Sequence, residues 1–413
     1  MSFRFLHLAD LHLETRFGGR PDTRERLRQA THEAFARAVD HAIENRLHAL
    51  LVAGDLFDDP ILSVRTELFF AGQLKRLAQA GIWFLAACGN HDPGGAGFRT
   101  AELGVEGERV RFFRGGEPQV LRVTDREGAP VGVVVGAGHA SDQESTNLAA
   151  SFPGVPGALP VVGLLHTSIE SAKSAADHDR YAPSTRADYV RLPYSYWALG
   201  HIHLRQQALA GLPVYYPGNL QGRNPRETGA KGGLAVEAFT GASANPGFVR
   251  FASVRWECVP VRELPASRSF EELAAALGRC IGAQPRDPDE SLALRLELEG
   301  ETPLAGRLRS GDELAQLEED LAARSGALEV QLRADRVSLP IDRAQLRQSP
   351  SVLSEALSLI ERARSDDALL AELAPAELAR TFDGDAARLG YLRELLGGLP
   401  EELTLRGVER EDA

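Results

Sequence analysis

Residues 49–58 read ALLVAGDLFD, a run of five apolar residues that passes through a glycine into an aspartate. The apolar run has the length and composition of a strand that is buried on both faces. The aspartate, Asp55, comes where that strand ends, and open α/β sheets place their ligand sites at such ends. This segment therefore predicts an α/β fold with a functional site beyond the carboxyl ends of its strands.

The same plan recurs along the first two hundred residues. Apolar side chains at helical spacing predict amphipathic helices at residues 24–45 and 65–79, between the strands. The predicted buried strands are residues 3–9, 49–53, 82–88, 161–165 and 196–199. A second, interleaved set of strands is predicted at residues 119–123, 131–135, 213–216, 233–236 and 249–261. We expect this second set to form a sheet that packs on the first.

Each of the five buried strands ends in a polar motif, and the motifs read DLH, GDLFD, GNHD, a single histidine and GHIH. Their residues are Asp10, His12, Asp55, Asn90, His91, Asp92, His166, His201 and His203. Imidazole, carboxylate and amide ligands without thiolates suit manganese, iron or zinc. Two such cations about 4 Å apart can clamp both oxygens of a phosphoryl displacement, and we predict that Asp55 bridges them.

Taken singly, each motif has an ordinary structural explanation. A lone histidine after a strand is commonly a satisfied core residue, and a Gly-Asp pair before a helix is commonly a turn and a helix cap. Five motifs in order at five strand ends are hard to obtain by chance. Their joint occurrence favours a metal site.

Length, charge and cysteine content narrow the class of protein. A chain of 413 residues favours more than one domain. Three widely spaced cysteines predict neither a disulfide framework nor a thiolate metal site. No stretch approaches the roughly 18 apolar residues of a membrane span, so we expect a cytoplasmic protein without a membrane partner. The net charge of −12 does not decide the substrate, because residues 351–413 hold 14 acidic residues against 7 arginines.

The pattern changes after residue 261. Helices are predicted at residues 270–281 and 312–324, strands at residues 292–298 and 327–332, and only helices beyond residue 339. We therefore predict three domains: residues 1–262 carry the metal site, residues 263–338 form a small α/β cap, and residues 339–413 form a helical region that binds a partner.

The five motifs together resemble the calcineurin-like metallophosphoesterase superfamily. The resemblance implies a four-layer α/β/β/α fold, in which two mixed sheets pack face to face with helices outside, followed here by the small cap and the helical tail. It implies that one metal is held by Asp10, His12, Asp55 and His203, and the other by Asp55, Asn90, His166 and His201. It gives His91 the role of protonating the leaving group or of stabilising the transition state, and we expect the adjacent Asp92 to orient it.

Three longer segments resemble the SbcD-type repair nucleases, and especially the YhaO-type bacterial exonucleases. They are RFLHLADLHLE at residues 4–14, GDLFDDP at residues 54–60 and VYYPGNLQGRNPRETGAKGG at residues 214–233. The resemblance implies a DNA exonuclease or endonuclease that acts in repair with an SbcC-like coiled-coil ATPase. We expect its two metal ions to be manganese, with iron or zinc as alternatives. The sequence does not decide whether the chain forms a homodimer. The segment GAGHAS around His139 does not follow the pattern and receives no role.

The loop at residues 217–233 is glycine-rich and can approach a phosphate backbone closely. We predict that it binds substrate through Asn219, Arg223, Arg226 and Lys231. The alternative is an ordinary solvated loop. Asp58 also has two interpretations: it is an acidic residue of the site, or it is a turn residue or a carboxylate outside the ligand set.

Other functions and another role for the tail remain open. The main alternative to a nuclease is a phosphatase or phosphodiesterase that acts on a small molecule or a phosphoprotein, and a further one is a metal-bound scaffold. Residues 351–363 place Val352, Leu353, Leu357 and Ile360 on one helical stripe, which predicts docking to a partner. The alternative is that this stripe covers the protein's own cap.

Overall fold

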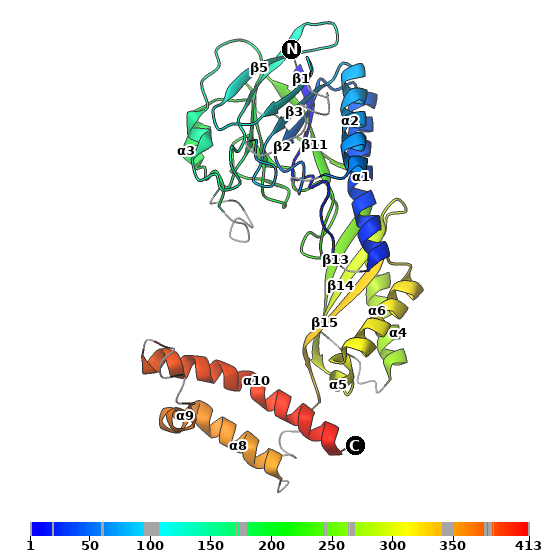
Figure 1. Cartoon of the computed structure of the whole chain (residues 1–413), viewed down its shortest axis with the longest axis vertical. Helices are drawn as coiled ribbons and strands as arrows, with labels where there is room; N and C mark the ends of the chain where they lie inside the picture. The colour runs from blue at the N-terminus through cyan, green and yellow to red at the C-terminus, as the bar shows by residue number, and fades with distance from the viewer. Residues whose placement is uncertain are drawn as a thin grey trace. The chain divides into compact units, whose positions relative to one another are not determined.

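The computed structural model forms two compact units, residues 1–257 with 286–293 and residues 258–285 with 294–413 (Figure 1). The structure describes residues 2–411 except residues 19, 59–61, 95–106, 170–171, 173–179, 243, 245, 263, 265–268, 341–350, 376–377, 379–381 and 383.

The first sheet of the larger unit is mixed. Its strands are β1 (Ser2–Leu8), β2 (Ala49–Ala53), β3 (Trp83–Ala87), β4 (Val110–Phe113), β11 (Gly232–Phe239) and β12 (Gly247–Arg250), in the order β12-β11-β1-β2-β3-β4. Strands β1 to β4 run parallel, and β11 joins them antiparallel to β1. The carboxyl ends of β1, β2 and β3 therefore lie at one edge of the sheet.

The second sheet is also mixed. Its strands are β5 (Gln119–Thr124), β6 (Pro130–Gly136), β7 (Val161–His166), β8 (Tyr196–Gly200), β9 (Gln206–Gln207) and β10 (Val214–Tyr216), in the order β5-β6-β7-β8-β10-β9. Strands β6, β7, β8 and β10 are parallel to one another. Strands β7 and β8, which both carry predicted ligands at their ends, are thus neighbours.

The assignment of strands to sheets differs in part from the sequence-based expectation. The strands predicted with the first set at residues 161–165 and 196–199 are β7 and β8 of the second sheet. The pattern places residues 233–236 in the second sheet, but β11 pairs with β1 in the first, where Val236 lies opposite Phe5. Residues 249–261 do not form one strand, because they divide into β12 and β13 (Val254–Val261). The division arises because the backbone of Phe251 and Ala252 turns to donate hydrogen bonds to the Lys231 carbonyl. An apolar pattern identifies a strand but does not identify its neighbour.

The two sheets pack face to face, and helices cover their outer faces, so the predicted four-layer fold is confirmed. The layer between the sheets holds side chains such as Phe5, Leu51 and Leu164. Helices α1 (Pro21–Glu44) and α2 (Val64–Gln79) lie together against the first sheet. The short elements η1 (Leu148–Ser151) and α3 (Arg186–Val190) cover the second sheet.

A histidine lies inside the apolar layer between the sheets. His7 of β1 is fully buried, and its Nε2–H donates to the carbonyl of Leu199 over 3.2 Å. Its Nδ1 accepts a hydrogen bond of 3.0 Å from the Tyr196 hydroxyl. Burial lowers the pKa of His7 to about 3, so the ring is neutral and joins β1 to β8 by two hydrogen bonds.

Beyond β12, the helices and strands are of the kinds predicted from the sequence. A three-stranded sheet in the order β13-β14-β15 contains β14 (Ser291–Glu301) and β15 (Glu329–Ser338). Its helices are α4 (Phe270–Gly282), α5 (Ala305–Leu308) and α6 (Gly311–Ser325), and the tail forms α8 (Val352–Ser365), α9 (Asp367–Leu373) and α10 (Asp385–Glu411). Within the described residues, no helix is long and apolar enough to cross a membrane. The three-domain division stays a prediction.

Candidate metal centre

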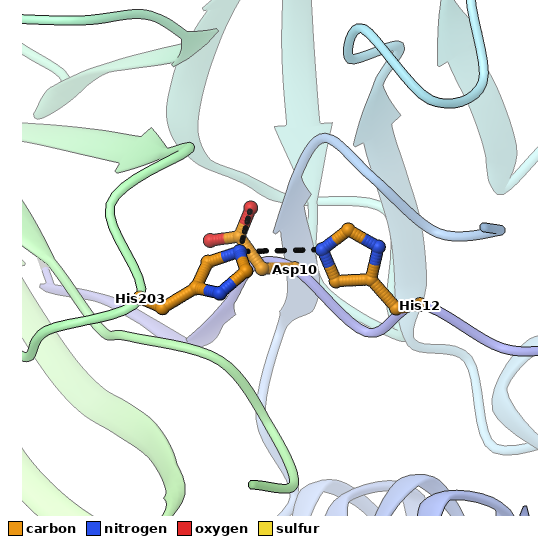
Figure 2. A group of neighbouring side chains, drawn as sticks. All are labelled: Asp10, His12 and His203. Carbon is orange, nitrogen blue, oxygen red and sulfur yellow. Dashed lines mark hydrogen bonds and ion pairs between the residues drawn. The ribbon is translucent and has the colours of Figure 1, made fainter. Parts of the chain in front are cut away.

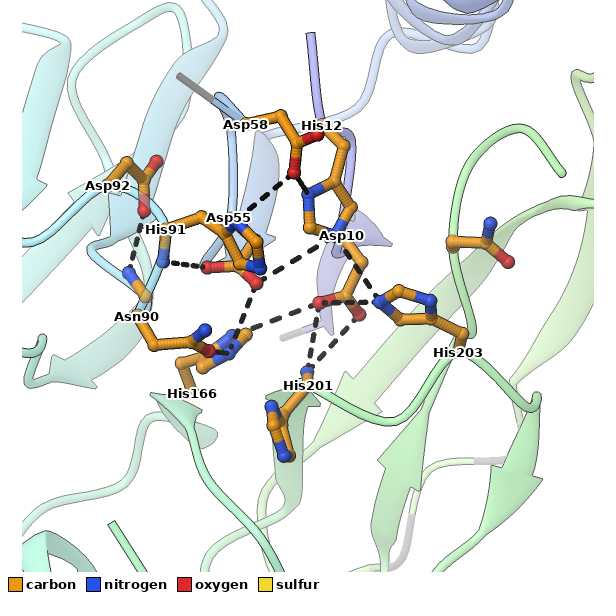
Figure 3. A network of polar contacts seen from close by, with 12 residues as sticks. Asp10, His12, Asp55, Asp58, Asn90, His91, Asp92, His166, His201 and His203 are labelled. Atoms are coloured by element: carbon orange, nitrogen blue, oxygen red, sulfur yellow. Dashed lines mark hydrogen bonds and ion pairs between the residues drawn. The ribbon is translucent and has the colours of Figure 1, made fainter. Parts of the chain in front are cut away.

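The polar ends of both sheets meet at one place (Figure 3). The backbone N–H of His201, just after β8, donates to the Asp10 carboxylate just after β1, at 3.1 and 3.2 Å to its two oxygens. This approach requires Gly200, because a Cβ there would lie 1.8 Å from the Ala53 carbonyl oxygen at the end of β2. The glycine therefore lets the ends of two strands from different sheets come into contact.

Several residues of the site hold a strained backbone. Among the described residues, the non-glycine positions with positive φ include Asp10 at 51°, His12 at 46°, Asp55 at 50° and His201 at 104°. This conformation is unfavourable for side chains with a Cβ and concentrates at functional sites. Here hydrogen bonds hold it in place, since Asp10 N–H donates to the Gly54 carbonyl and His12 N–H donates to the Asp55 carbonyl.

A first group of potential ligands consists of Asp10, His12 and His203 (Figure 2). The Nε2 atoms of the two histidines lie 3.3 Å apart, and His203 Nε2 lies 3.9 Å from Asp10 Oδ1. His12 Nδ1 donates to Asp58 at 2.9 Å, and His203 Nδ1 donates to Glu227 at 2.8 Å. Carboxylates only accept, so the protons lie on the Nδ1 atoms and two Nε2 lone pairs face each other. A cation between them would turn that repulsion into ligation.

A second group of potential ligands surrounds His166. Its Nδ1–H donates to the Ala53 carbonyl at 2.9 Å, which leaves the Nε2 lone pair facing Asn90 Oδ1 at 3.0 Å. Asp55 Oδ2 lies 3.5 Å from this Nε2 and 3.8 Å from His12 Nε2. One carboxylate oxygen of Asp55 therefore lies between the two groups.

The charge balance of these buried groups also fits cations. Burial lowers the pKa of His12 and of His166 to about 4 each, so both imidazoles are neutral and able to donate a lone pair. Burial, followed by the charge of Asp55, raises the pKa of Asp10 well above its ordinary value. A buried carboxylate pair beside neutral imidazoles is stabilised by positive charge. The donor set fits divalent cations of intermediate hardness.

The contacts of His201 say less about metal binding than those of the other predicted ligands do. Its ring packs edge-on against the ring of His166, with the two centroids 5.2 Å apart. Its side chain lines the cleft described below. The contact that joins His201 to Asp10 is made by its backbone N–H. Its role as a ligand stays a prediction.

The partner of His91 is Asp58 and not Asp92. His91 Nδ1 lies 3.1 Å from Asp58 Oδ1, and this hydrogen bond raises the pKa of His91 above its ordinary value. The Asp92 carboxylate instead accepts the backbone N–H groups of Leu56 and Gly89, both at 2.8 Å. The expectation that Asp92 orients His91 therefore differs from the structure. Asp92 fixes the loop backbone, and Asp58 joins His91 to His12.

The four predicted substrate-binding residues separate into two kinds. The Asn219 amide is buried and donates to Glu227 at 2.7 Å, and Lys231 Nζ donates to the His203 carbonyl at 3.1 Å. These two hold the loop and the second GHIH histidine in place. The Arg223 guanidinium lies 3.4 Å from Asp58 and 3.3 Å from Glu227, and it lines the cleft together with Arg226.

The two ligand groups open into a cleft of about 1040 Å³. Its wall includes Asp55, Asn90, His91, His201, His203, Arg223, Arg226, Glu227 and Lys231. It also includes Asp142 and Tyr181, which sequence reasoning missed because they lie on loops outside the motifs. Glu227 was missed as well. The signal that could have found it is the need of a ligating histidine for an outer carboxylate.

Comparison with known protein families gives two matches. Residues 3–204 match the calcineurin-like phosphoesterase family. Residues 256–341 match the middle domain of metallophosphoesterase YhaO.

Three relatives illustrate the similarity. The uncharacterized metallophosphoesterase YhaO of Bacillus subtilis is 31% identical over 304 residues, which cover 72% of each chain. The DNA double-strand break repair protein Mre11 of Archaeoglobus fulgidus is 24% identical over 88% of this chain and 81% of its own. The SbcD component of the nuclease SbcCD of Escherichia coli is 25% identical over 51% of this chain and 58% of its own.

Proposed function

The chain belongs to the calcineurin-like phosphoesterase family, and on that premise we propose that it is a metal-dependent nuclease that hydrolyses phosphodiester bonds in DNA. The observation that carries the proposal is the pair of ligand groups around Asp55, which open into a cleft whose wall bears Arg223 and Arg226. Guanidinium groups suit phosphate oxygens, which favours an anionic, phosphate-bearing substrate.

The proposed ligands follow the two groups. Asp10, His12, Asp55 and His203 would hold one cation, and Asp55, Asn90, His166 and His201 the other. Two cations, when bound, would supply an activated water and compensate the charge on the phosphate oxygens. The donors are nitrogen and oxygen atoms that suit manganese, iron or zinc, and among these we propose manganese. Asp58 and Glu227 orient the first pair of histidines through their Nδ1 protons.

His91 is the proposed proton donor. Its Nδ1–H is held by Asp58, and 42% of its side chain is exposed, on the wall of the cleft. The raised pKa keeps this ring protonated nearer to neutral pH, so its Nε2–H can be given to the leaving oxygen. Asp92 acts on the same loop through the backbone and does not touch the reacting atoms.

Three observations support a nucleic acid over a small substrate. The cleft of about 1040 Å³ is roomy for one phosphate group. The match to the YhaO middle domain adds a second region that a minimal phosphatase does not need. Relatives of this chain include a DNA double-strand break repair protein and a nuclease component. A phosphatase or phosphodiesterase for small molecules is the alternative.

The test is an assay of the full chain on single- and double-stranded DNA, a small aryl diester and an aryl monoester, each with manganese and with chelator. We expect manganese-dependent cleavage of DNA. Arg226→Ala should weaken DNA cleavage severalfold and leave the small diester unaffected. Cleavage of the monoester or of the small diester without cleavage of DNA would support the alternative. No cleavage of any ester with metal bound would contradict the proposal.

We also propose that the C-terminal helices bind a coiled-coil ATPase similar to SbcC. An apolar groove of about 540 Å³ lies among α8, α9 and α10, and its wall includes Leu359, Ile360, Leu373, Leu392 and Leu395. Leu373 and Leu395 are about half exposed, which suits the docking of a partner helix. Leu395→Glu should abolish co-purification with a coiled-coil ATPase of the same genome, whereas Glu394→Gln, beside it, should not.

A further inference from the structure

His139 lies in the GAGHAS segment, to which none of the site motifs gives a role. The residue follows β6, and its side chain is fully buried behind the second ligand group. Nothing in the motif pattern connects it with the metal centre. Its contacts in the structure connect it with both segments that present the predicted ligands Asn90 and His166.

The backbone of His139 brackets the loop that carries Asn90. Its N–H donates to the Cys88 carbonyl at 3.0 Å, and its carbonyl accepts the N–H of Gly94 at 2.9 Å. Residues 89–93 lie between these two hydrogen bonds, and they include both Asn90 and His91. The ends of the loop are therefore fixed to a single residue.

The ring of His139 reaches the other strand. Its Nε2–H donates to the carbonyl of His166 at 2.9 Å, and its ring packs edge-on against the ring of His166 with centroids 5.2 Å apart. Because that carbonyl only accepts, the proton lies on Nε2. His139 thus contacts the loop of Asn90 by its main chain and the end of β7 by its side chain.

The segment is shaped for this close approach. A Cβ on Gly138 would lie 1.9 Å from the Phe113 carbonyl oxygen and 2.7 Å from the Cys88 nitrogen. Gly138 also donates its N–H to the Gly115 carbonyl at 3.0 Å. Only glycine can bring the backbone of residue 139 this near to the end of β3.

The donor nitrogen is what a histidine adds here. His139 Nδ1 is buried and has no hydrogen-bond partner among the described residues. An apolar side chain of similar size would fill the space without burying an unpartnered nitrogen, which is unfavourable. The Nε2–H bond to His166 is the contact that such a side chain could not make.

We propose that His139 is a positioning residue that sets the distance between Asn90 and His166, and through it the affinity for the second cation. In the structure Asn90 Oδ1 and His166 Nε2 lie 3.0 Å apart. The inference rests on the proposed metal binding. Outer contacts of this kind typically change metal affinity about 10- to 100-fold. His139 acts on the second group, whose members Asn90 and His166 lie on the two segments that it joins.

The experiment is a titration of the metal-free full chain with manganese, followed by calorimetry and by electron paramagnetic resonance. In His139→Leu we expect the second cation to bind about 10- to 100-fold more weakly and the first to bind unchanged. The signal of a magnetically coupled pair should give way to that of an isolated ion. His139→Gln should restore the pair, because its amide can donate to the His166 carbonyl, whereas the shorter His139→Asn should not.

Phe152→Leu is the matched control, since Phe152 is equally buried but lies in the outer core of the second sheet. Unchanged affinity for both cations in the Leu and Asn variants would overturn the inference. Equal weakening of both sites, the same loss in the Phe152 control, or failure of Gln to restore the pair would also overturn it. If the unaltered chain binds fewer than two cations, the proposed metal centre itself is wrong, which is a distinguishable result. The Gln and Asn variants decide the matter if the Leu variant does not fold.

Discussion

Asp58 connects the candidate metal centre to His91, the proposed proton donor, so its charge should affect both. Oδ1 of Asp58 accepts from His12 Nδ1 at 2.9 Å and from His91 Nδ1 at 3.1 Å. The change Asp58→Asn keeps the size of the side chain and one acceptor oxygen but removes the negative charge. The two hydrogen bonds differ in burial, because the His12 side chain is 1% exposed and that of His91 is 42% exposed.

The two contacts lead to different magnitudes. The exposed His91 contact is screened by solvent, so its loss is worth about 1 kcal/mol, or about fivefold in rate. The buried contact orients a proposed ligand, and its loss should weaken manganese binding about 10- to 100-fold. At saturating manganese we therefore expect a loss of about fivefold in kcat, and at limiting manganese a much larger loss.

The assay is hydrolysis of a small diester across a manganese titration, with metal content measured by elemental analysis. As manganese rises, the rate should recover to within about fivefold of that of the unaltered enzyme. An Asp58→Asn enzyme with unchanged manganese affinity would refute the role of Asp58 in orienting His12. A loss of more than about a thousandfold in kcat at saturating manganese would refute the separate magnitudes assigned to the two contacts. Such a loss far exceeds the one assigned to the exposed His91 contact.

The other contacts of the site and the tail lead to four more expected outcomes. His91→Asn should keep metal and fold but lose about 10² to 10⁴-fold in rate, and loss of metal by elemental analysis would identify His91 as a ligand instead. Asp55→Ala should lose both cations, so a variant with near-full metal content would contradict the bridge. His7 is protonated near pH 6.5 in the unfolded chain and only near pH 3 in the folded chain. The free energy of unfolding should therefore fall as pH drops below about 6.5, and His7 alone should contribute up to about 1.4 kcal/mol per pH unit. In denaturant unfolding of His7→Gln, the free energy of unfolding should depend less steeply on pH. An identical dependence would exclude His7 as its source. Deleting residues 340–413 should spare hydrolysis of a small diester and abolish binding of a coiled-coil ATPase, and loss of hydrolysis or of folding would place the tail in the core.

The sequence predicts where an element or a motif lies along the chain better than it predicts which residues it contacts in the fold. Buried strands such as β2 are found to the residue because five apolar residues and a following glycine define both ends. Within each sheet the strand-end motifs lie together because parallel strands share one edge, and the packing of the two sheets brings the two edges into contact. The partner of His91 could not be predicted, because adjacency of Asp92 in the chain says nothing about which way its carboxylate points. Asp92 turns to the backbone of Leu56, and Asp58 takes its place.

Loop residues show the same limit for a different reason. Asn219 and Lys231 have the chemistry of phosphate ligands, but a buried polar group takes the nearest unsatisfied partner within the protein. Those partners are Glu227 for Asn219 and the His203 carbonyl for Lys231. Their use inside the fold depends on where the loop passes, which residue types alone do not give.

The predicted donors of each proposed cation are divided between the two sheets. Asp10 and Asp55 follow strands of the first sheet, while His166 ends one strand of the second sheet and His203 follows another. Neither half can hold a cation in full before the sheets have docked, so metal cannot guide the early steps of folding. Once the sheets have docked, the bound ions would stabilise the contact between them. A cation at a hundredfold excess over its dissociation constant would add about 2.7 kcal/mol to the free energy of unfolding. Metal binding would then contribute to the stability of the folded chain as well as to its chemistry.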